Sequence, residues 1–142
     1  MSGLSDEPVD GPRTIQPQAW PPPRGYTNGI SARGRTLWVA GQIGWDPLTC
    51  RFESDDFVAQ AAQAMRNVAD VLRAGGAEAR HVVRLTWYVV DRDAYLARPR
   101  ELGAAYREVF GRHYPAMSAV IVAGLVEPRA LVEIEATAVV PD

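Results

Sequence analysis

Cysteine is almost absent from this 142-residue sequence, which contains Cys50 alone. One cysteine excludes a disulfide within the chain and is too few for a cysteine-based metal site. Cys50 lies in the segment D-P-L-T-C-R, residues 46–51, which predicts a turn, and we assign its thiol no chemical role. We expect the protein to use no metal and no other cofactor.

Long apolar runs and an excess of one charge are also lacking. The 15 basic and 17 acidic residues leave a net charge of −2, which favours neither nucleic acid nor an anionic membrane as a partner. No apolar run approaches the roughly 20 residues that cross a bilayer, and the first residues do not have the pattern of a signal peptide. We therefore expect a soluble, cytoplasmic protein.

Residues 1–23 are polar and rich in proline, with three consecutive prolines after Trp20. Such a composition cannot build a core by itself, so we predict a loose N-terminal tail whose last residues pack along the domain. Residues 24–142 have the length of one domain with a single buried core.

Two β-patterned runs open the domain, at residues 26–31 and 36–43. We predict that they form a hairpin, with Gly34 supplying the turn conformation. The glycine at the end of the second run, Gly41, is a candidate site residue because glycine lets a ligand approach the backbone closely. Alternation predicts the two faces of this strand, with Leu37, Val39 and Gly41 on one and Trp38, Ala40 and Gln42 on the other.

Residues 54–76 have the clearest helical pattern in the chain. Ser54 is the predicted cap, two glycines end the helix, and an apolar stripe at helical spacing predicts that the helix lies on a sheet. A second helix is predicted from residue 100 to 110, and Pro99 either kinks an earlier turn or begins this helix.

Residues 81–91 predict a long strand that is dense in β-branched and aromatic side chains. His81 is predicted to be a solvated residue at its beginning. Between residues 84 and 90 both faces of the strand are apolar, which in a small domain indicates that the face without helices contacts another subunit.

Two more β-patterned runs, residues 117–123 and 130–140, are joined by a loop at residues 124–128. In the second run, alternation places Val132, Ile134, Ala136 and Ala138 on the core face and Glu133, Glu135 and Thr137 on the other. These carboxylates must therefore point outward, into a cleft or into a subunit interface. The order ββαβαββ predicts an α+β fold with two helices on one face of a mixed sheet.

Several of these segments together resemble the RidA/YjgF family over residues 24–140. The similar segments are H-Y-P-A-M-S-A-V (113–120), V-E-I-E-A-T-A (132–138), G-Y-T-N-G-I (25–30), L-W-V-A-G-Q-I (37–43) followed by Asp46-Pro47, and the helix F-V-A-Q-A-A-Q-A-M-R-N-V (57–68). Linked motifs in register are much more specific than any one of them. The resemblance implies a chorismate-mutase-like fold with a mixed six-stranded sheet, assembled as a homotrimer with clefts between the subunits.

The resemblance also implies a reaction, the hydrolysis of reactive enamines and imines to keto acids and ammonia. In such clefts an arginine pairs with the substrate carboxylate and a glutamate handles the attacking water. Carried over residue by residue, the glutamate is Glu133, the cleft tyrosine is Tyr26 and the glycine of the cleft wall is Gly41. Ala119 falls at a small position whose backbone faces the ligand.

Met117 stands where the resemblance places the arginine. Methionine cannot pair with a carboxylate, so the cleft is expected to be more apolar than in the family and to prefer a neutral or aromatic ligand. Aromatic residues expected to extend it are Trp45, Tyr114 and Trp38. Alternatively, another cation replaces the arginine, with Arg84, Arg112, Arg129 and His113 as the candidates.

Three functions are compatible with these observations. The first is a deaminase-type hydrolase of enamines, imines or related conjugated carbonyl compounds, with a substrate range altered by Met117. The second is a non-catalytic trimer that binds a small molecule in a regulatory or protective role. The third, RNA cleavage, is an older label within the family, and the acidic balance and lack of a histidine pair disfavour it. We adopt the first interpretation.

Overall fold

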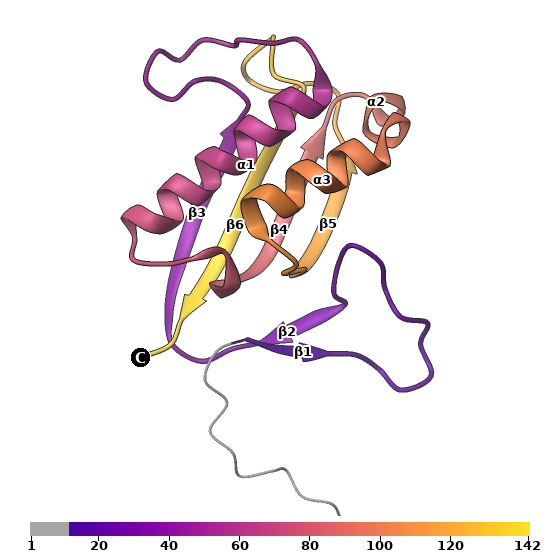
Figure 1. Cartoon of the computed structure of the whole chain (residues 1–142), viewed down its shortest axis with the longest axis vertical. Coiled ribbons are helices and arrows are strands. Elements are labelled where there is room, and N and C mark those ends of the chain that lie inside the picture. Colours follow the sequence, from indigo (N-terminus) through magenta and orange to yellow (C-terminus); the bar gives the residue numbers. More distant parts are fainter. Residues whose placement is uncertain (1–11) are drawn as a thin grey trace, which may run out of the picture.

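The computed structural model describes residues 12–142 and has two layers, a sheet and the helices that cover it (Figure 1). The strands are β1 (Arg13–Ile15), β2 (Gly29–Ser31), β3 (Arg35–Ile43), β4 (Val82–Val89), β5 (Ala116–Ile121) and β6 (Val132–Val140). The helices are α1 (Phe57–Ala74), the 3-10 turn η1 (Ala79–His81), α2 (Arg92–Ala97) and α3 (Pro99–Phe110).

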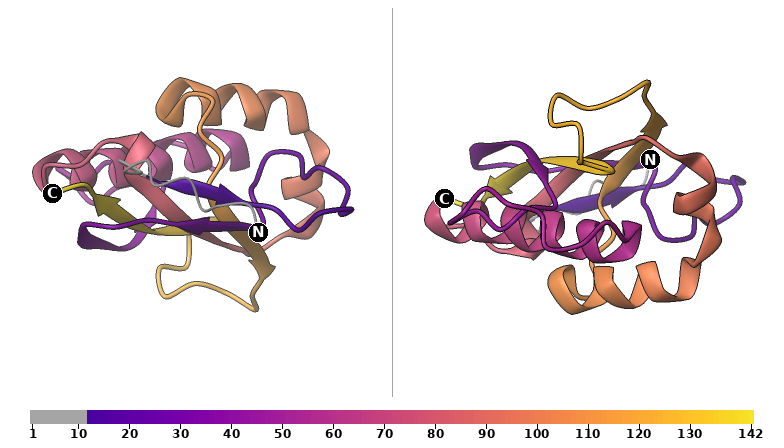
Figure 2. Two further views of the ribbon diagram at one scale, coloured as in Figure 1. Left: turned by 90° about the horizontal axis from the view of Figure 1, so that it is seen from below. Right: turned by 90° about the horizontal axis from the view of Figure 1, so that it is seen from above.

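The main sheet is mixed and has the strand order β3-β6-β4-β5. β6 runs antiparallel to both of its neighbours, whereas β4 and β5 are parallel. Figure 2 shows α1 and α3 on one face of this sheet, while the connection between β5 and β6 projects from the opposite face. The predicted α+β architecture is therefore confirmed, with Pro99 beginning α3 as a separate helix.

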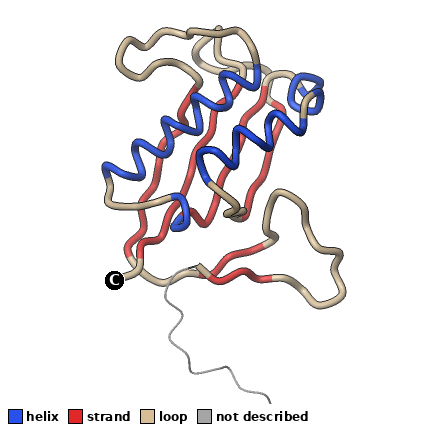
Figure 3. The backbone as a smooth tube through the Cα atoms, viewed as in Figure 1, coloured by secondary structure: helices blue, strands red, loops and turns tan. Residues whose placement is uncertain are grey.

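The predicted hairpin between residues 26–31 and 36–43 is wrong. β2 pairs instead with β1, and the two form a separate antiparallel ribbon at one end of the main sheet (Figure 3). β3 pairs with β6, because that nine-residue strand offers a long alternating apolar face that the three residues of β2 lack.

Within the described residues, the main sheet therefore contains four strands and not six. The ribbon also brings Arg13–Ile15 of the predicted N-terminal tail into a strand. Residues 1–11 of that tail lie outside the described part of the chain, and the predicted domain boundary at residue 23 stays a prediction.

The core lies between α1 and the helix-covered face of the sheet. The apolar stripe of α1, which includes Ala61, Met65 and Val68, is fully buried, as its spacing predicts. The helix begins two residues later than predicted. Asp56 and not Ser54 is the N-cap, and its carboxylate accepts a hydrogen bond from the Ala59 N–H at 3.0 Å.

His81 is buried and not solvated, contrary to the prediction, with only 6% of its surface exposed. Its Nδ1 accepts a hydrogen bond from the Glu78 N–H at 3.0 Å and so closes the η1 turn. Burial, with a smaller contribution from Arg80, lowers the pKa of His81 and favours the neutral ring that this hydrogen bond requires. None of the helices between residues 12 and 142 is long and apolar enough to span a membrane.

Candidate functional site

Glu133 lies on the face of the sheet that the helices leave uncovered. Its neighbours along β6, Val132 and Ile134, are fully buried on the opposite face, so the alternation predicted for this strand is confirmed. Across the β4–β6 ladder Glu133 pairs with Tyr88, and Glu135 pairs with Thr86.

Gly41 lies against the Glu133 side chain. A β-bulge between Val39 and Gln42 shifts the register of β3 against β6. A Cβ atom at Gly41 would be 2.3 Å from Glu133 Oε1, so the bulge places Gly41 on the Glu133 face. The prediction that Gly41 shares a face with Leu37 and Val39 is therefore wrong, because simple alternation ends at the bulge.

The two carboxylates of β6 differ in their partners. Glu135 accepts a hydrogen bond from the Tyr88 hydroxyl at 2.8 Å, whereas no donor among residues 12–142 reaches the Glu133 carboxylate. The hydrogen bond to Glu135 raises the pKa of Tyr88, with further contributions from burial and from both carboxylates. The Glu133 carboxylate thus remains available to a water molecule or a ligand.

Met117 lies on the opposite face of the sheet from Glu133. In the parallel β4–β5 ladder Met117 pairs with Leu85, which is fully buried on the helix-covered side. Residues paired across a ladder point to the same face, and Met117 accordingly packs against the core. Because Leu85 and Tyr88 point to opposite faces of β4, the side chains of Met117 and Glu133 cannot meet within one chain.

Met117 and Tyr26 line one open cavity of ≈670 Å³ on the helix-covered side. It lies between α3, the β4–β5 edge and the segment that leads into β2. The remaining aromatic residues of its wall are Trp87, Tyr95, Tyr106 and Tyr114. The prediction that Tyr114 extends the pocket beside Met117 is therefore confirmed, and the volume suits a small organic ligand.

The aromatic wall of this cavity is held in a defined arrangement. The Trp87 and Tyr95 rings meet edge to face with centroids 6.2 Å apart, and Tyr106 stacks on Tyr114 at 5.5 Å. The Tyr106 hydroxyl donates a hydrogen bond to the His113 carbonyl at 2.6 Å, and burial raises the pKa of Tyr106. These contacts keep Tyr106 as a neutral, fixed part of the wall.

The other two aromatic residues expected at the cleft do not line this cavity. Trp45 does not line this cavity and packs against Phe52 with ring centroids 5.9 Å apart. Trp38 lies on the uncovered face, where it is 74% exposed beside a shallow groove that includes Arg84, Thr86 and Glu135.

None of the four predicted replacement cations lines the cavity, whereas Arg24 and Arg107 do. Arg129 forms an ion pair with Asp55, at 2.7 Å, and Nε2 of His113 lies 2.7 Å from the Val82 carbonyl oxygen. Arg84 is on the opposite face and Arg112 is outside the cavity wall. The one signal for Arg24 in the sequence is its position directly before Gly25-Tyr26, and for Arg107 its position after Tyr106.

Ala119 lies two residues beyond Met117 on the edge strand β5, where it is exposed and pairs with Trp87. It does not line the cavity, and its predicted role stays a prediction. Among residues 12–142, no group of three His, Cys, Asp or Glu side chains is placed to hold a metal ion.

Comparison with known proteins identifies the family. The family model described as endoribonuclease L-PSP, which covers the RidA/YjgF proteins, matches residues 17–140. This protein belongs to the RidA/YjgF family. A human relative, 2-iminobutanoate/2-iminopropanoate deaminase, is 32% identical over 106 residues, which are 74% of this chain and 73% of the relative.

Solved structures of other RidA/YjgF proteins share the fold. The Rid family protein YyfB from Yersinia pestis superimposes with a TM-score of 0.81 at 33% identity, covering 92% of this chain and 99% of that one. The structure of Escherichia coli TdcF with bound serine gives a TM-score of 0.63 at 29% identity, covering 89% of this chain and 98% of TdcF.

Proposed function

We propose that this protein hydrolyses a small reactive imine or enamine to a carbonyl compound and ammonia. Its similarity to the human imine deaminase supports this reaction class. The observation that carries the proposal is the Glu133 carboxylate, which lies against the bare backbone of Gly41 and accepts no hydrogen bond from residues 12–142. A carboxylate that accepts no hydrogen bond from the protein can accept a proton from water, and imine hydrolysis requires such a general base.

The reaction proceeds by addition of water to the C=N bond. The water oxygen bonds to the imine carbon as Glu133 takes one water proton and the C=N electron pair moves to nitrogen. Glu133 delivers that proton to nitrogen, which gives the neutral carbinolamine. Glu133 then takes the hydroxyl proton and passes it to nitrogen, so that the C–N bond breaks and ammonia leaves as the C=O bond forms. The sequence contains no lysine, so the chemistry does not pass through a Schiff base with a lysine side chain.

The cleft is formed by two copies of the chain. One copy supplies Glu133 and Gly41 from its uncovered face, and the next supplies Tyr26, Met117 and the exposed edge at Ala119. This arrangement is supported by the positions of Met117 and Glu133 on opposite faces of one sheet. A homotrimer, as the family resemblance implies, repeats this contact three times and leaves three equivalent clefts.

Met117 sets the substrate range in this proposal. At the position where the resemblance implies an arginine, its side chain contacts the substrate through an apolar surface and leaves the substrate carboxylate to other residues. The preferred imine is therefore expected to be larger and more apolar than 2-aminoacrylate.

Ammonia release from 2-aminoacrylate and from bulkier aromatic and uncharged imines tests the proposal. Replacing Glu133 with Gln removes the proton acceptor with little change in shape, so kcat is expected to fall by about 10²-fold or more. Glu135→Gln is the matched control, because its amide oxygen can still accept the Tyr88 hydroxyl hydrogen and activity should be retained.

Two results would contradict the hydrolase proposal. One is equal activity of the Glu133→Gln and wild-type proteins. The other is a wild-type protein that binds these compounds but releases no ammonia above the uncatalysed rate, which would establish the non-catalytic binding protein instead.

A further inference from the structure

The cavity beside Met117 carries positive charge and no negative charge. Arg24 and Arg107 line it, and no acidic side chain among residues 12–142 does. Neither arginine forms an ion pair within the described residues, although five other arginines do so or pair with backbone oxygen. Two guanidinium groups beside an aromatic wall favour an anionic, planar ligand, since guanidinium binds carboxylates and aromatic rings bind flat apolar groups.

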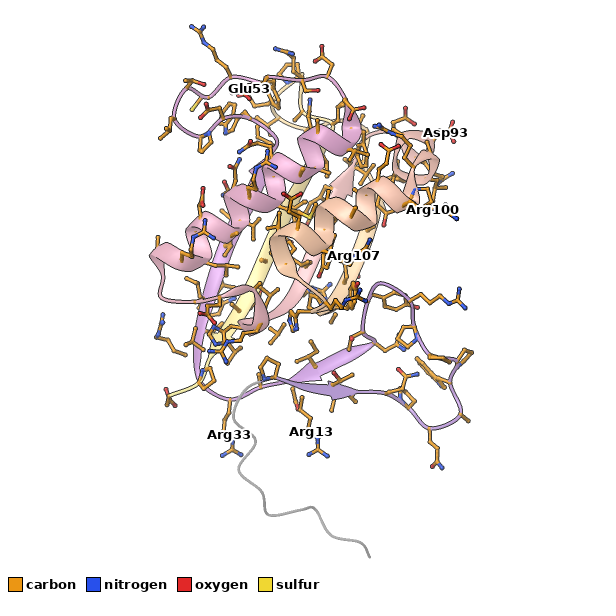
Figure 4. All side chains as sticks on the ribbon, in the orientation of Figure 1. Arg13, Arg33, Glu53, Asp93, Arg100 and Arg107 are labelled. Atoms are coloured by element: carbon orange, nitrogen blue, oxygen red, sulfur yellow. The ribbon has the colours of Figure 1, made fainter. Side chains whose placement is uncertain are left out.

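Arg107 is held in the cavity wall by the shape of α3. Its side chain runs back along the helix over Gly103, where an added Cβ atom would be 3.2 Å from Arg107 Nη1. Glycine within a helix costs stability relative to alanine, and here it leaves room for the guanidinium group. Figure 4 labels Arg107 on α3, together with Arg100 near the beginning of the same helix.

Trp87 supplies an unused hydrogen-bond donor in the same wall. Its side chain is 2% exposed, and Nε1 is the one buried side-chain polar atom between residues 12 and 142 that has no partner. Buried indole N–H groups normally have an acceptor. An oxygen or nitrogen atom of a ligand seated against Trp87 would fill this role.

We propose that the cavity binds an aromatic 2-oxo or 2-imino acid, with its carboxylate on Arg107 and an acceptor atom directed at the Trp87 N–H. The choice of a carbonyl acid rests on the proposed function, whereas the aromatic and anionic character follows from the cavity itself. Arg107 thus replaces, from α3, the carboxylate anchor that Met117 cannot provide from β5. Arg24 provides a second positive charge in the cavity lining.

Equilibrium binding of phenylpyruvate, measured by calorimetry, tests this assignment without requiring turnover. Pyruvate lacks the ring and phenylacetone lacks the carboxylate, so each is expected to bind at least about tenfold more weakly than phenylpyruvate. Arg107→Met should weaken phenylpyruvate binding by about ten- to hundredfold and leave phenylacetone binding unchanged.

Arg100→Met is the matched control, because it removes the same charge from the same exposed helix outside the cavity. Trp87→Phe keeps an aromatic side chain but removes the indole N–H, and should weaken phenylpyruvate binding several-fold. Equal binding by the Arg107→Met and Arg100→Met proteins, or no preference for phenylpyruvate over phenylacetone, would overturn the assignment.

Phenylpyruvate binding and ammonia release, both measured on the wild-type and Arg107→Met proteins, separate the two proposals. Tight, Arg107-dependent binding by a wild-type protein that releases no ammonia would reject the hydrolase and retain the ligand assignment. Ammonia release that is indifferent to Arg107→Met would reject the assignment and retain the hydrolase.

Discussion

The Glu133 carboxylate occupies the space where any side chain at residue 41 would begin. Glycine is therefore needed at this position to leave space for the carboxylate. The backbone itself does not require it, because φ at Gly41 is not positive. The lack of a side chain at residue 41 thus leaves the room that the Glu133 carboxylate occupies.

Gly41→Ala tests this dependence. The new Cβ would displace a flexible carboxylate and not the backbone, so the free energy of unfolding should change by less than about 1 kcal/mol. If Glu133 is the proton acceptor that we propose, its displacement by about 1 Å is expected to lower kcat by at least about tenfold. The measurement is ammonia release beside chemical denaturation. Gly124→Ala, where an added Cβ meets no atom within 4 Å, is the control and should retain wild-type kcat. Wild-type kcat in Gly41→Ala would show that Glu133 placement does not depend on residue 41.

At the level of single residues, alternation in β6 was sufficient to predict the face of Glu133. It was not sufficient for Gly41, because a bulge is a property of the pairing between two strands and leaves no periodic signal in either one. Arg107 was missed for a related reason. Its position in the helical pattern predicts an ordinary exposed residue. Only the packing of α3 over the β4–β5 edge makes it part of a cavity.

Among the elements, α1 depends on its N-terminal cap. Asp56 accepts the Ala59 N–H and also pairs with Arg98, which lies directly before α3, so one carboxylate ties the beginnings of two helices together. The Ala59 hydrogen bond and then the Arg98 guanidinium lower the pKa of Asp56 below 3.8, against the opposing effect of partial burial.

Asp56→Ala is expected to lower the free energy of unfolding by about 1 kcal/mol at pH 7. For a domain of this size the melting temperature should fall by about 2–4 °C. A carboxyl whose pKa is lower when folded stabilises the protein above its unfolded pKa and loses that effect as the pH falls through the folded value. The difference between the two proteins should therefore persist at pH 5 and shrink below about pH 4.

The control for this cap is Asp55→Ala. Asp55 precedes Asp56, and its side chain is 81% exposed in an ion pair with Arg129. Its replacement should cost less than about 0.5 kcal/mol. A pH-independent difference between the wild-type and Asp56→Ala proteins would indicate that the carboxylate charge does not contribute to the cap.

The elements themselves were largely predictable, whereas their partners were not. The helix from residue 57 and the strands that become β4 and β6 follow from local spacing. The pairing of β2 with β1 does not follow from local spacing. A strand of three residues has too little apolar pattern to specify its partner, so the rest of the fold determines which strand it pairs with. The predicted hairpin failed because residues adjacent in sequence were assumed to pair.

At the scale of the whole molecule, the uncovered face of the sheet exposes apolar surface that nothing within one described chain covers. It carries Trp38 at 74% exposure together with Glu133 and Tyr88, a combination of apolar surface and functional groups that suits contact with another copy. Local patterns predicted this open face, but the placement of Met117 and Glu133 on opposite faces of the sheet became evident only from the β4–β5 register.

Mixed assemblies test whether the cleft contains two copies. The Glu133→Gln and Tyr26→Ala proteins are each expected to lose at least about tenfold in kcat, since they damage opposite halves of the cleft. When the two are co-expressed with different tags and purified through both, clefts that combine an intact Glu133 with an intact Tyr26 reappear. Every trimer that contains both variants has one intact cleft among its three, so activity should return to about a third of wild type. Mass measurement of the mixed species by sedimentation should give three chains. If both halves instead came from the same chain, no mixture would exceed the activity of its two components, because every chain carries one damaged half.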